Sequence, residues 1–218
     1  MIFKDREEAG RLLANEIIKK YDHNLQNPLV VAIPRGGVVV AKPIADSLNA
    51  PLTVILVKKI GAPFNEEYAI GAITEDGEIL ISPNISEDIA LKLGITDDYI
   101  YSKSKEILEI LKERKNLYRN SIKDFDVKDK DIILVDDGIA TGLTTETAIL
   151  SIRNLFPNRI ILAVPVMPYE KVDQFKELVD DLIVLHTPVN FSAVGQFYVD
   201  FSQVSDEDVM NILNEYVS

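Results

Sequence analysis

The sequence predicts an α/β fold in which helices flank a mostly parallel sheet of five strands. Five short apolar runs have the near-continuous hydrophobic character of strands buried on both faces. Segments with helical spacing separate most of these runs, as the crossovers of a parallel sheet require. A chain of 218 residues with 47% hydrophobic content suits one domain (residues 1–218) with a sizeable core. The five runs cover residues 29–33, 52–57, 132–135, 159–165 and 181–186.

The first elements form one half of a βαβ unit. Asp5 begins a capping box, and apolar residues recur at helical spacing over residues 6–21. The strand 29–33 then runs through the turn Pro34-Arg35-Gly36-Gly37 into the apolar segment 38–48. A strand, a glycine turn and a helix in this order predict a parallel neighbour for the first strand.

An insertion over residues 61–128 separates the second strand from the third. Residues 68–74 and 78–82 flank Asp76-Gly77, a pair that is typical of a tight hairpin turn. Ser86 and Thr96 then cap two predicted helices. The insertion therefore consists of a hairpin and two helices.

The second helix of the insertion carries three basic residues near its C-terminus, Arg114, Lys115 and Arg119. Their simplest role is to complement the helix dipole. They are also candidates for the phosphate-binding face or for a contact with a second subunit. The sequence leaves these alternatives open.

Beyond the fifth strand, residues 187–203 form a glycine-containing loop with several aromatic side chains. Phe191 and Tyr198 are candidates for stacking a flat heterocycle, and packing of this segment on the core is an equal alternative. The remaining predicted helices cover residues 144–155, 169–179 and 206–216.

Residues 132–145 form the stretch around which the chain is organised. An apolar strand ends on Asp136 and Asp137, and a glycine-punctuated turn then enters a helix near Thr144. The first N–H groups of that helix have no partner within it, and the positive end of its dipole favours an anion. The two carboxylates need hydroxyl groups or a metal ion to face them. These features predict a site for a phosphate and a sugar.

The segment Val135 to Thr144 resembles the 5-phosphoribosyl-1-pyrophosphate (PRPP) loop of the type I phosphoribosyltransferases: apolar residues, two acids, three residues, Thr or Ser, Gly, any residue, Thr. No Gly-x-x-x-x-Gly-Lys-Ser/Thr or Gly-x-Gly-x-x-Gly loop competes with it. The resemblance implies the type I phosphoribosyltransferase fold, with Asp136 and Asp137 as catalytic residues that hold the ribose hydroxyls. It places Mg²⁺ beside them, indirectly, through ribose or water. The implied 5-phosphate contacts are Ala140, Thr141, Gly142, Leu143, Thr144 and Thr145.

In that family the first loop cradles pyrophosphate, which implies this role for Arg35, Gly36 and Gly37. An arginine can pair with pyrophosphate oxygens in a bidentate manner, and the glycine N–H groups add donors. Lys58 and Lys59 follow the second predicted strand at the edge where parallel sheets place their ligands. They are further candidates for pyrophosphate, with Lys58 ranked first.

The insertion occupies the place where this family carries a mobile hood over the reaction centre, and Glu67 and Tyr68 are residues that such a hood would present. A plain surface hairpin is the alternative, and the sequence leaves it open. Several further segments resemble a poorly characterised branch of predicted phosphoribosyltransferases, although Asn120 stands where a glycine is expected. These segments are Phe3 to Gly10, Pro34 to Gly37, Lys59 to Pro63, Glu67 to Ala72, Tyr118-Arg119 and Ala193 to Tyr198.

The resemblance implies transfer of the 5-phosphoribosyl group from PRPP to a nitrogenous base, with Mg²⁺ as cofactor and release of pyrophosphate. The alternative is a non-catalytic regulatory protein that binds PRPP or a nucleotide. Such a protein would keep the residue 136–145 loop and lose its pyrophosphate contacts, whereas Arg35 and the lysine pair are present. The implied partners are PRPP and a small base, and a homodimer is left open.

Composition narrows the remaining classes of function. The net charge of −12 and pI near 4.6 disfavour nucleic acid as a partner. The absence of cysteine excludes disulfides and thiolate chemistry, and the histidines, His23 and His186, are expected to be ordinary surface or core residues. No apolar run has the length of a membrane span or a signal peptide, so we expect a cytoplasmic protein that does not engage a membrane.

Overall fold

The computed structural model describes residues 1–22, 24–122 and 125–217, and His23 lies outside these ranges. The central sheet is parallel throughout, with the strand order β2-β1-β6-β7-β8. The prediction of five strands in a parallel sheet is confirmed. The strands are β1 (Leu29–Ala32), β2 (Leu52–Val54), β6 (Asp131–Val135), β7 (Arg159–Val166) and β8 (Asp181–His186).

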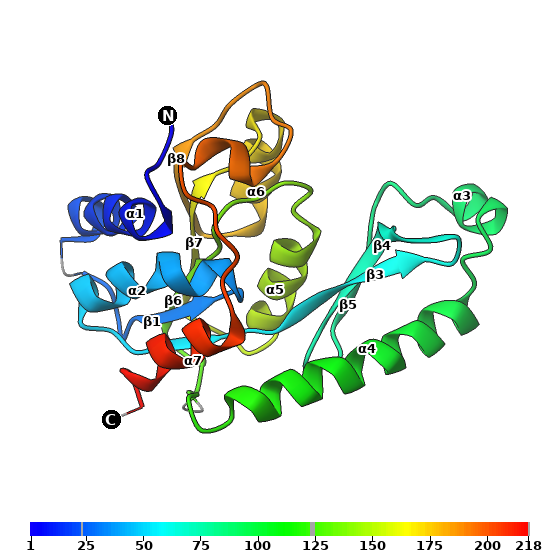
Figure 1. Ribbon diagram of the computed structural model, residues 1–218, viewed down its shortest axis with the longest axis horizontal. Coiled ribbons are helices and arrows are strands. Elements are labelled where there is room, and N and C mark those ends of the chain that lie inside the picture. Colours follow the sequence, from blue (N-terminus) through cyan, green and yellow to red (C-terminus); the bar gives the residue numbers. More distant parts are fainter. Residues whose placement is uncertain (23, 123–124, 218) are drawn as a thin grey trace.

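Helices cover both faces of the central sheet (Figure 1). α1 (Arg6–Tyr21), α2 (Gly36–Leu48) and α7 (Asp206–Asn214) contribute to one apolar core. α5 (Leu143–Arg153) and α6 (Val172–Leu178) contribute to a second core on the opposite face. The short 3-10 turn η1 (Tyr169–Lys171) directly precedes α6, so the helix predicted over residues 169–179 consists of η1 and α6. A second 3-10 turn, η2 (Val194–Phe197), lies within the aromatic loop after β8.

A smaller antiparallel sheet and two helices project from the central sheet (Figure 1). We call residues 57–118, which contain them, the hood. The predicted hairpin around Asp76-Gly77 is confirmed as β4 and β5, and Ser86 and Thr96 cap α3 and α4 as predicted. The elements of the hood are β3 (Val57–Ala62), β4 (Asn65–Thr74), β5 (Ile79–Ile81), α3 (Glu87–Lys92) and α4 (Asp97–Tyr118).

The structure corrects the single strand expected over residues 52–57. The Ile55 N–H still donates to the Ala32 carbonyl of β1, at 3.0 Å. Leu56 instead pairs with the hood, because its N–H donates to the Glu75 carboxylate at 3.1 Å and its carbonyl accepts from the Glu75 N–H. One apolar run therefore contributes to two sheets, and β3 of the hood begins at Val57.

Side-chain contacts fix both ends of α4, and the one at its C-terminal end joins the hood to the rest of the chain. Tyr118 is fully buried at the C-terminal end, and its hydroxyl donates to the carboxylate of Asp206 in the first turn of α7. Nearby, Lys115 pairs with Glu75 at 3.0 Å. At the other end the Tyr99 hydroxyl donates to the Gly61 carbonyl of β3, at 2.7 Å. These contacts fix α4 against its own sheet and against the C-terminal helix.

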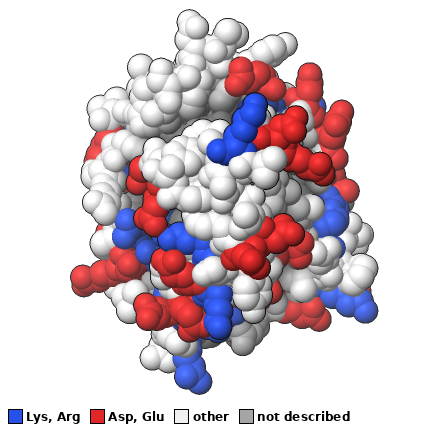
Figure 2. All heavy atoms as spheres, turned by 90° about the vertical axis from the view of Figure 1, so that its right-hand side faces the viewer, with Lys and Arg blue, Asp and Glu red and all other residues white. Residues whose placement is uncertain are grey.

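Seen from the hood end, the surface carries acidic and basic side chains interspersed, with carboxylates more frequent (Figure 2). This distribution agrees with the net charge of −12. Within the part of the chain that the structure describes, no helix combines the length and apolar character needed to cross a bilayer.

Candidate active site

Two loops meet at one edge of the central sheet because the strands before them are parallel neighbours. Ala32 at the end of β1 is in register with Val135 at the end of β6. The Ile33 N–H continues this pairing by donating to the Val135 carbonyl, at 2.9 Å. The glycine turn at Arg35 and the turn that follows Asp136 therefore leave the sheet side by side, as the sequence predicts for a ligand site in a parallel sheet.

Asp136 and Asp137 lie at the start of the second loop. Burial raises the pKa of Asp136 well above its usual range, and the adjacent charge of Asp137 raises it further. The Asp137 N–H opposes this shift by donating to Asp136 Oδ1 at 2.8 Å. Burial also raises the pKa of Asp137, against the attraction of Arg6. The pair is a desolvated acidic site that favours a positively charged or hydroxyl-bearing ligand.

Arg6, the first residue of α1, completes the acidic site. Its Nε donates to Asp137 Oδ2 at 2.8 Å, and the two side chains are only 11% and 17% exposed. The sequence analysis assigned Arg6 no role in the site. Its position in the first turn of a helix gave no signal, because only the fold brings it to a residue 131 positions away.

The second loop ends at a helix with an open N-terminus. Gly142 is the N-cap of α5, with φ 88°, and no side chain caps this helix. The positive φ needs glycine, and it leaves the first N–H groups of α5 available to an anion. Thr141 is exposed and Thr144 is half-buried, whereas Thr145 is 1% exposed. The predicted phosphate contact of Thr145 would therefore use its backbone.

The first loop also ends at a helix without a side-chain cap. Arg35 is the N-cap of α2, the peptide bond between Pro34 and Arg35 is cis, and no acidic residue lies in the first turn. Gly36 is required by close approach, because a Cβ there would lie 1.9 Å from Asp137 Oδ2. The Arg35 guanidinium lies 3.9 Å from Asp206. This loop thus offers a cation and free N–H groups beside the acid pair.

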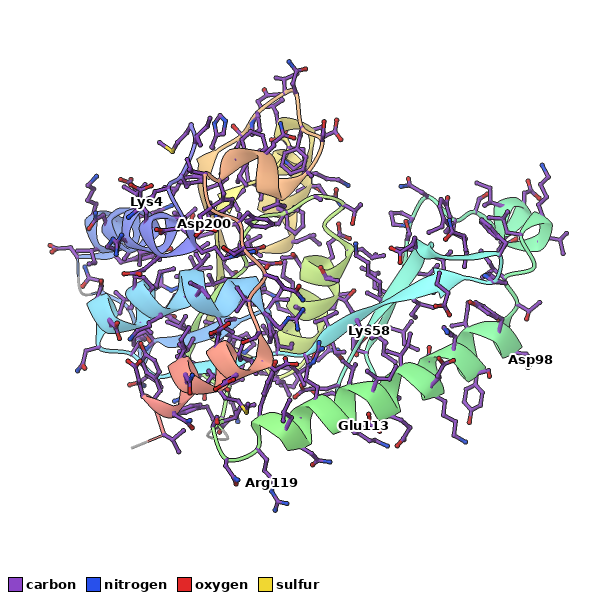
Figure 3. All side chains as sticks on the ribbon, viewed as in Figure 1. Lys4, Lys58, Asp98, Glu113, Arg119 and Asp200 are labelled. Carbon is purple, nitrogen blue, oxygen red and sulfur yellow. The ribbon has the colours of Figure 1, made fainter. Side chains whose placement is uncertain are left out.

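Lys58 and Lys59 lie in β3 of the hood, and not at the C-terminal end of a strand in the central sheet. Neighbouring side chains of a strand point to opposite faces. The charge of Lys59 acts on Asp136, whereas that of Lys58 acts on the hood residue Glu66. Figure 3 shows Lys58 where the hood joins the body. Lys59 also lines the cleft beside α5, so it is the better placed of the two for a ligand contact, and the ranking itself stays a prediction.

A profile of the phosphoribosyl transferase domain matches residues 3–202. The chain belongs to this family. Two proteins of Mycobacterium tuberculosis, from strains CDC 1551 and H37Rv, are each 36% identical to it over 213 residues and are provisionally named phosphoribosyl transferases. The match covers 98% of this chain and 46% of each relative, so the chain spans about half of their length.

Solved structures show the same fold. TT1426 from Thermus thermophilus is 39% identical, with a TM-score of 0.83 and coverage of 100% of both chains. The AQ2163 protein from Aquifex aeolicus is 15% identical, with a TM-score of 0.51 and coverage of 87% of this chain and 76% of that one. The second likeness concerns the fold alone.

In this phosphoribosyl transferase domain, two cavities lie against the two loops. One, of about 440 Å³, is lined by Arg6, Arg35, Gly36 and the acid pair, among others. The other, of about 720 Å³, lies between the hood and α5 and α6. Its walls include Lys59, Glu67, Tyr68, Asn84, Thr141, Glu146 and Gln174. The two predicted hood residues, Glu67 and Tyr68, thus face the body across a cleft.

The structure corrects the expectation for Tyr198 as a stacking residue. Tyr198 is 6% exposed, its ring stacks on Phe201 at a centroid distance of 5.0 Å, and its hydroxyl donates to the Asp137 carbonyl at 2.6 Å. Stacking a base needs an exposed ring face, and this ring is part of the core. Phe191 is half-buried and stacks on Phe197 at 5.4 Å, and its role toward a base stays a prediction.

Glu146 is a second site residue that sequence reasoning missed. It is nearly buried in the first turn of α5, and burial raises its pKa. The amide of Gln174 donates to it from α6. A carboxylate in this position would repel a phosphate at the helix N-terminus, and its raised pKa weakens that repulsion. The only sequence signal was its place four residues after Gly142.

The three basic residues near the C-terminal end of α4 have different surroundings. Arg114 lies 3.8 Å from Asp206, the carboxylate that also faces Arg35, so it is linked through Asp206 to the loop at residues 35–37. Lys115 pairs within the hood. Arg119 projects away from the central sheet beyond the end of α4 (Figure 3).

Proposed function

We propose that this chain transfers the 5-phosphoribosyl group of PRPP to a nitrogen of a small base and releases pyrophosphate. Family membership supports the type of reaction, and the arrangement of the site supports the donor. The acid pair would hold the ribose hydroxyls, the loop at residues 140–145 the 5-phosphate, and the loop at residues 35–37 the pyrophosphate.

One observation carries the proposal: the two loops that meet at the acid pair each lead into a helix N-terminus without a side-chain cap. The other helices of eight or more residues in the described chain, α1, α4 and α7, are capped by Asp5, Thr96 and Ser205. An uncapped N-terminus binds anions. Two such ends flanking a diol-binding pair match a sugar that carries phosphate at one end and pyrophosphate at the other.

The residues around the reacting carbon suit departure of pyrophosphate. Bond cleavage gives positive character to the ribose, and the charge of an ionised Asp136 or Asp137 stabilises it in a site of low polarity. Arg35 and Lys59 would hold the negative charge that develops on the leaving group. The hood would exclude water, which otherwise competes with the base for the sugar.

The donor set fits magnesium bound largely through the substrate. Among the described residues, no cluster of three or more His, Asp or Glu side chains could ligate a metal. Mg²⁺ prefers six oxygens and commonly takes them from one or two carboxylates, phosphates and water. Asp136 and Asp137 would therefore hold the ion through ribose hydroxyls or water. When bound, it would neutralise charge on the pyrophosphate.

The cleft between hood and body is the proposed site of the acceptor. Its volume of about 720 Å³ is in the range of small-molecule sites. It borders the residue 140–143 segment on one side and Lys59 on the other, so a base there would lie next to the sugar. A regulatory protein that only senses PRPP would not need the pyrophosphate loop, whose Gly36 is packed directly against Asp137.

Titration of the protein with PRPP, followed by an assay of Mg²⁺-dependent pyrophosphate release with a panel of bases, tests the proposal. We expect release with at least one base, and its loss in the double variant Asp136→Asn, Asp137→Asn. Asp173→Asn is the matched control, since that carboxylate is 96% exposed. Tight PRPP binding without turnover would support the sensor, and absence of PRPP binding would refute both functions.

A further inference from the structure

The N-terminal residues and the loop after η2 form one wall of the candidate site. The Phe3 N–H donates to the Phe197 carbonyl, and the Val199 N–H donates to the Phe3 carbonyl, both at 2.8 Å. The Asp200 N–H donates to the Lys4 carbonyl, also at 2.8 Å, and Figure 3 labels these two residues next to each other. Two segments far apart in the chain are thereby joined next to Arg6.

The Arg6 guanidinium is held by two contacts with this wall and by one with Asp137. The guanidinium carbon lies 3.9 Å from the centroid of the Phe201 ring. One terminal nitrogen donates to the Ser202 carbonyl at 2.9 Å, and Nε donates to Asp137 Oδ2 at 2.8 Å. A guanidinium with a stacked face and two directed bonds has one position, unlike a lysine ammonium on a flexible stem.

The same wall holds Asp137 from its other side. The Tyr198 hydroxyl donates to the Asp137 backbone carbonyl, and the Tyr198 ring packs between Phe3 and Phe201. Side chain and backbone of Asp137 are thus both fixed by the segment that fixes Arg6. The carboxylate, in turn, lies on the wall of the 440 Å³ cavity together with Arg35 and Gly36.

Stability is a poor explanation for this ion pair. Replacing a buried pair by apolar residues of similar size is often neutral or stabilising, because both charges lose their hydration. A second arginine on α1, Arg11, gives a comparison with a surface ion pair. Arg11 pairs with Glu7 at 2.5 Å where both side chains are more than half exposed, as expected of a surface pair. The Arg6 side chain is instead only 11% exposed, and its Nε faces the Asp137 carboxylate.

We propose that Arg6 is a positioning residue which fixes the Asp137 carboxylate for the ribose hydroxyls. The proposal rests on the proposed function, since it assumes that Asp137 faces a sugar diol. Arg6 acts through Asp137, so the loss of Arg6 has no further effect on sugar binding once Asp137 can no longer act as a charged acceptor. A residue that only supports the fold would weaken binding in both backgrounds.

A double-mutant cycle measured by calorimetry with ribose 5-phosphate, in EDTA, tests this coupling. The variants are Arg6→Met, Asp137→Asn and the combination of the two, with Arg11→Met as the control. We expect Arg6→Met to weaken ribose 5-phosphate binding about tenfold to a hundredfold, the range for a hydrogen bond between charged groups. The double variant should bind no more weakly than Asp137→Asn, and Arg11→Met should bind as the wild type.

Two further measurements separate positioning from folding. Arg6→Lys keeps the charge without the planar fork, so its affinity should lie between those of the wild type and Arg6→Met. Inorganic phosphate, which needs only the residue 140–145 loop, should bind equally to all folded variants. Additive losses in the cycle, or an equal loss of phosphate binding in Arg6→Met, would overturn the role of Arg6. Failure of the wild type to bind ribose 5-phosphate would instead overturn the proposed function beneath it.

Discussion

Substitution of Gly36 by alanine gives a direct test of how closely the two loops of the site must approach. Gly36 is the first residue of α2, and a Cβ at this position would lie 1.9 Å from Asp137 Oδ2 and 2.8 Å from Arg6 Nε. A real Cβ atom essentially never lies within 3.0 Å of such a neighbour, so the Asp137 carboxylate must move away by about 1 Å. It cannot do so freely, because Arg6 holds it.

The expected result of Gly36→Ala is a loss of function without a loss of fold. Misplacement of a reacting group by about 1 Å costs on the order of a hundredfold in rate. We therefore expect pyrophosphate release to fall about a hundredfold, with weaker binding of ribose 5-phosphate. The helix itself should not suffer, since alanine is a better helix former than glycine by up to about 1 kcal/mol.

The assay combines calorimetry, pyrophosphate release and thermal melting, with Gly77→Ala as the matched control. A Cβ at Gly77 meets nothing within 4 Å, although the φ of 90° there adds backbone strain. That variant should be slightly less stable and should bind as the wild type. If Gly36→Ala binds ribose 5-phosphate and releases pyrophosphate at wild-type levels, the position of Asp137 does not matter and the reasoning fails.

Three further predictions follow from the geometry. Gly142→Ala should lower the free energy of unfolding in urea by about 1–3 kcal/mol, because its φ of 88° is unfavourable for alanine, and an unchanged value would contradict this. Lys59→Met should weaken binding of inorganic pyrophosphate about tenfold, and Lys58→Met less than twofold; equal effects would remove the distinction between them. Asp131→Asn should cost about 3 kcal/mol of stability near neutral pH, since the carboxylate is fully buried and paired with Arg159 at 2.8 Å. Burial alone would raise the pKa of Asp131, but its hydrogen bonds hold that pKa below the usual value. The wild type should therefore lose this stability as the pH falls below about 4, whereas the stability of Asp131→Asn should not change over that range.

Local sequence signals predicted most of the architecture. Asp5, Ser86 and Thr96 were expected to cap helices, and each accepts a hydrogen bond from the N–H three residues later. These interactions lie within one turn, so the sequence contains all of their partners. The buried strands could also be predicted from the sequence, because a strand covered on both faces must be apolar along its whole length.

The hydrophobic pattern gave a wrong prediction where one apolar segment pairs first with the central sheet and then with the hood sheet. Residues 52–57 are uniformly apolar apart from Thr53, yet Leu52–Val54 pairs with β1 whereas Val57 pairs with β4 in the hood. Hydrophobicity reports that a residue is buried and does not report against what. The same ambiguity affected Tyr198, whose aromatic ring suited a ligand and the core equally well until its contacts with Phe3 and Phe201 were known.

The sequence by itself determined that two acids and a glycine turn join one buried strand to one helix, since Asp136, Asp137 and Gly142 lie within a single local segment, and this pattern predicted a loop for a phosphate and a sugar. Only the tertiary structure decided how the acid pair is held. Arg6 reaches Asp137 across 131 residues, and the Tyr198 hydroxyl reaches it from 61 residues in the other direction. The sequence around Arg6 does not indicate this role, because its partner Asp137 is brought to it only when α1 and the loop after η2 pack against the sheet.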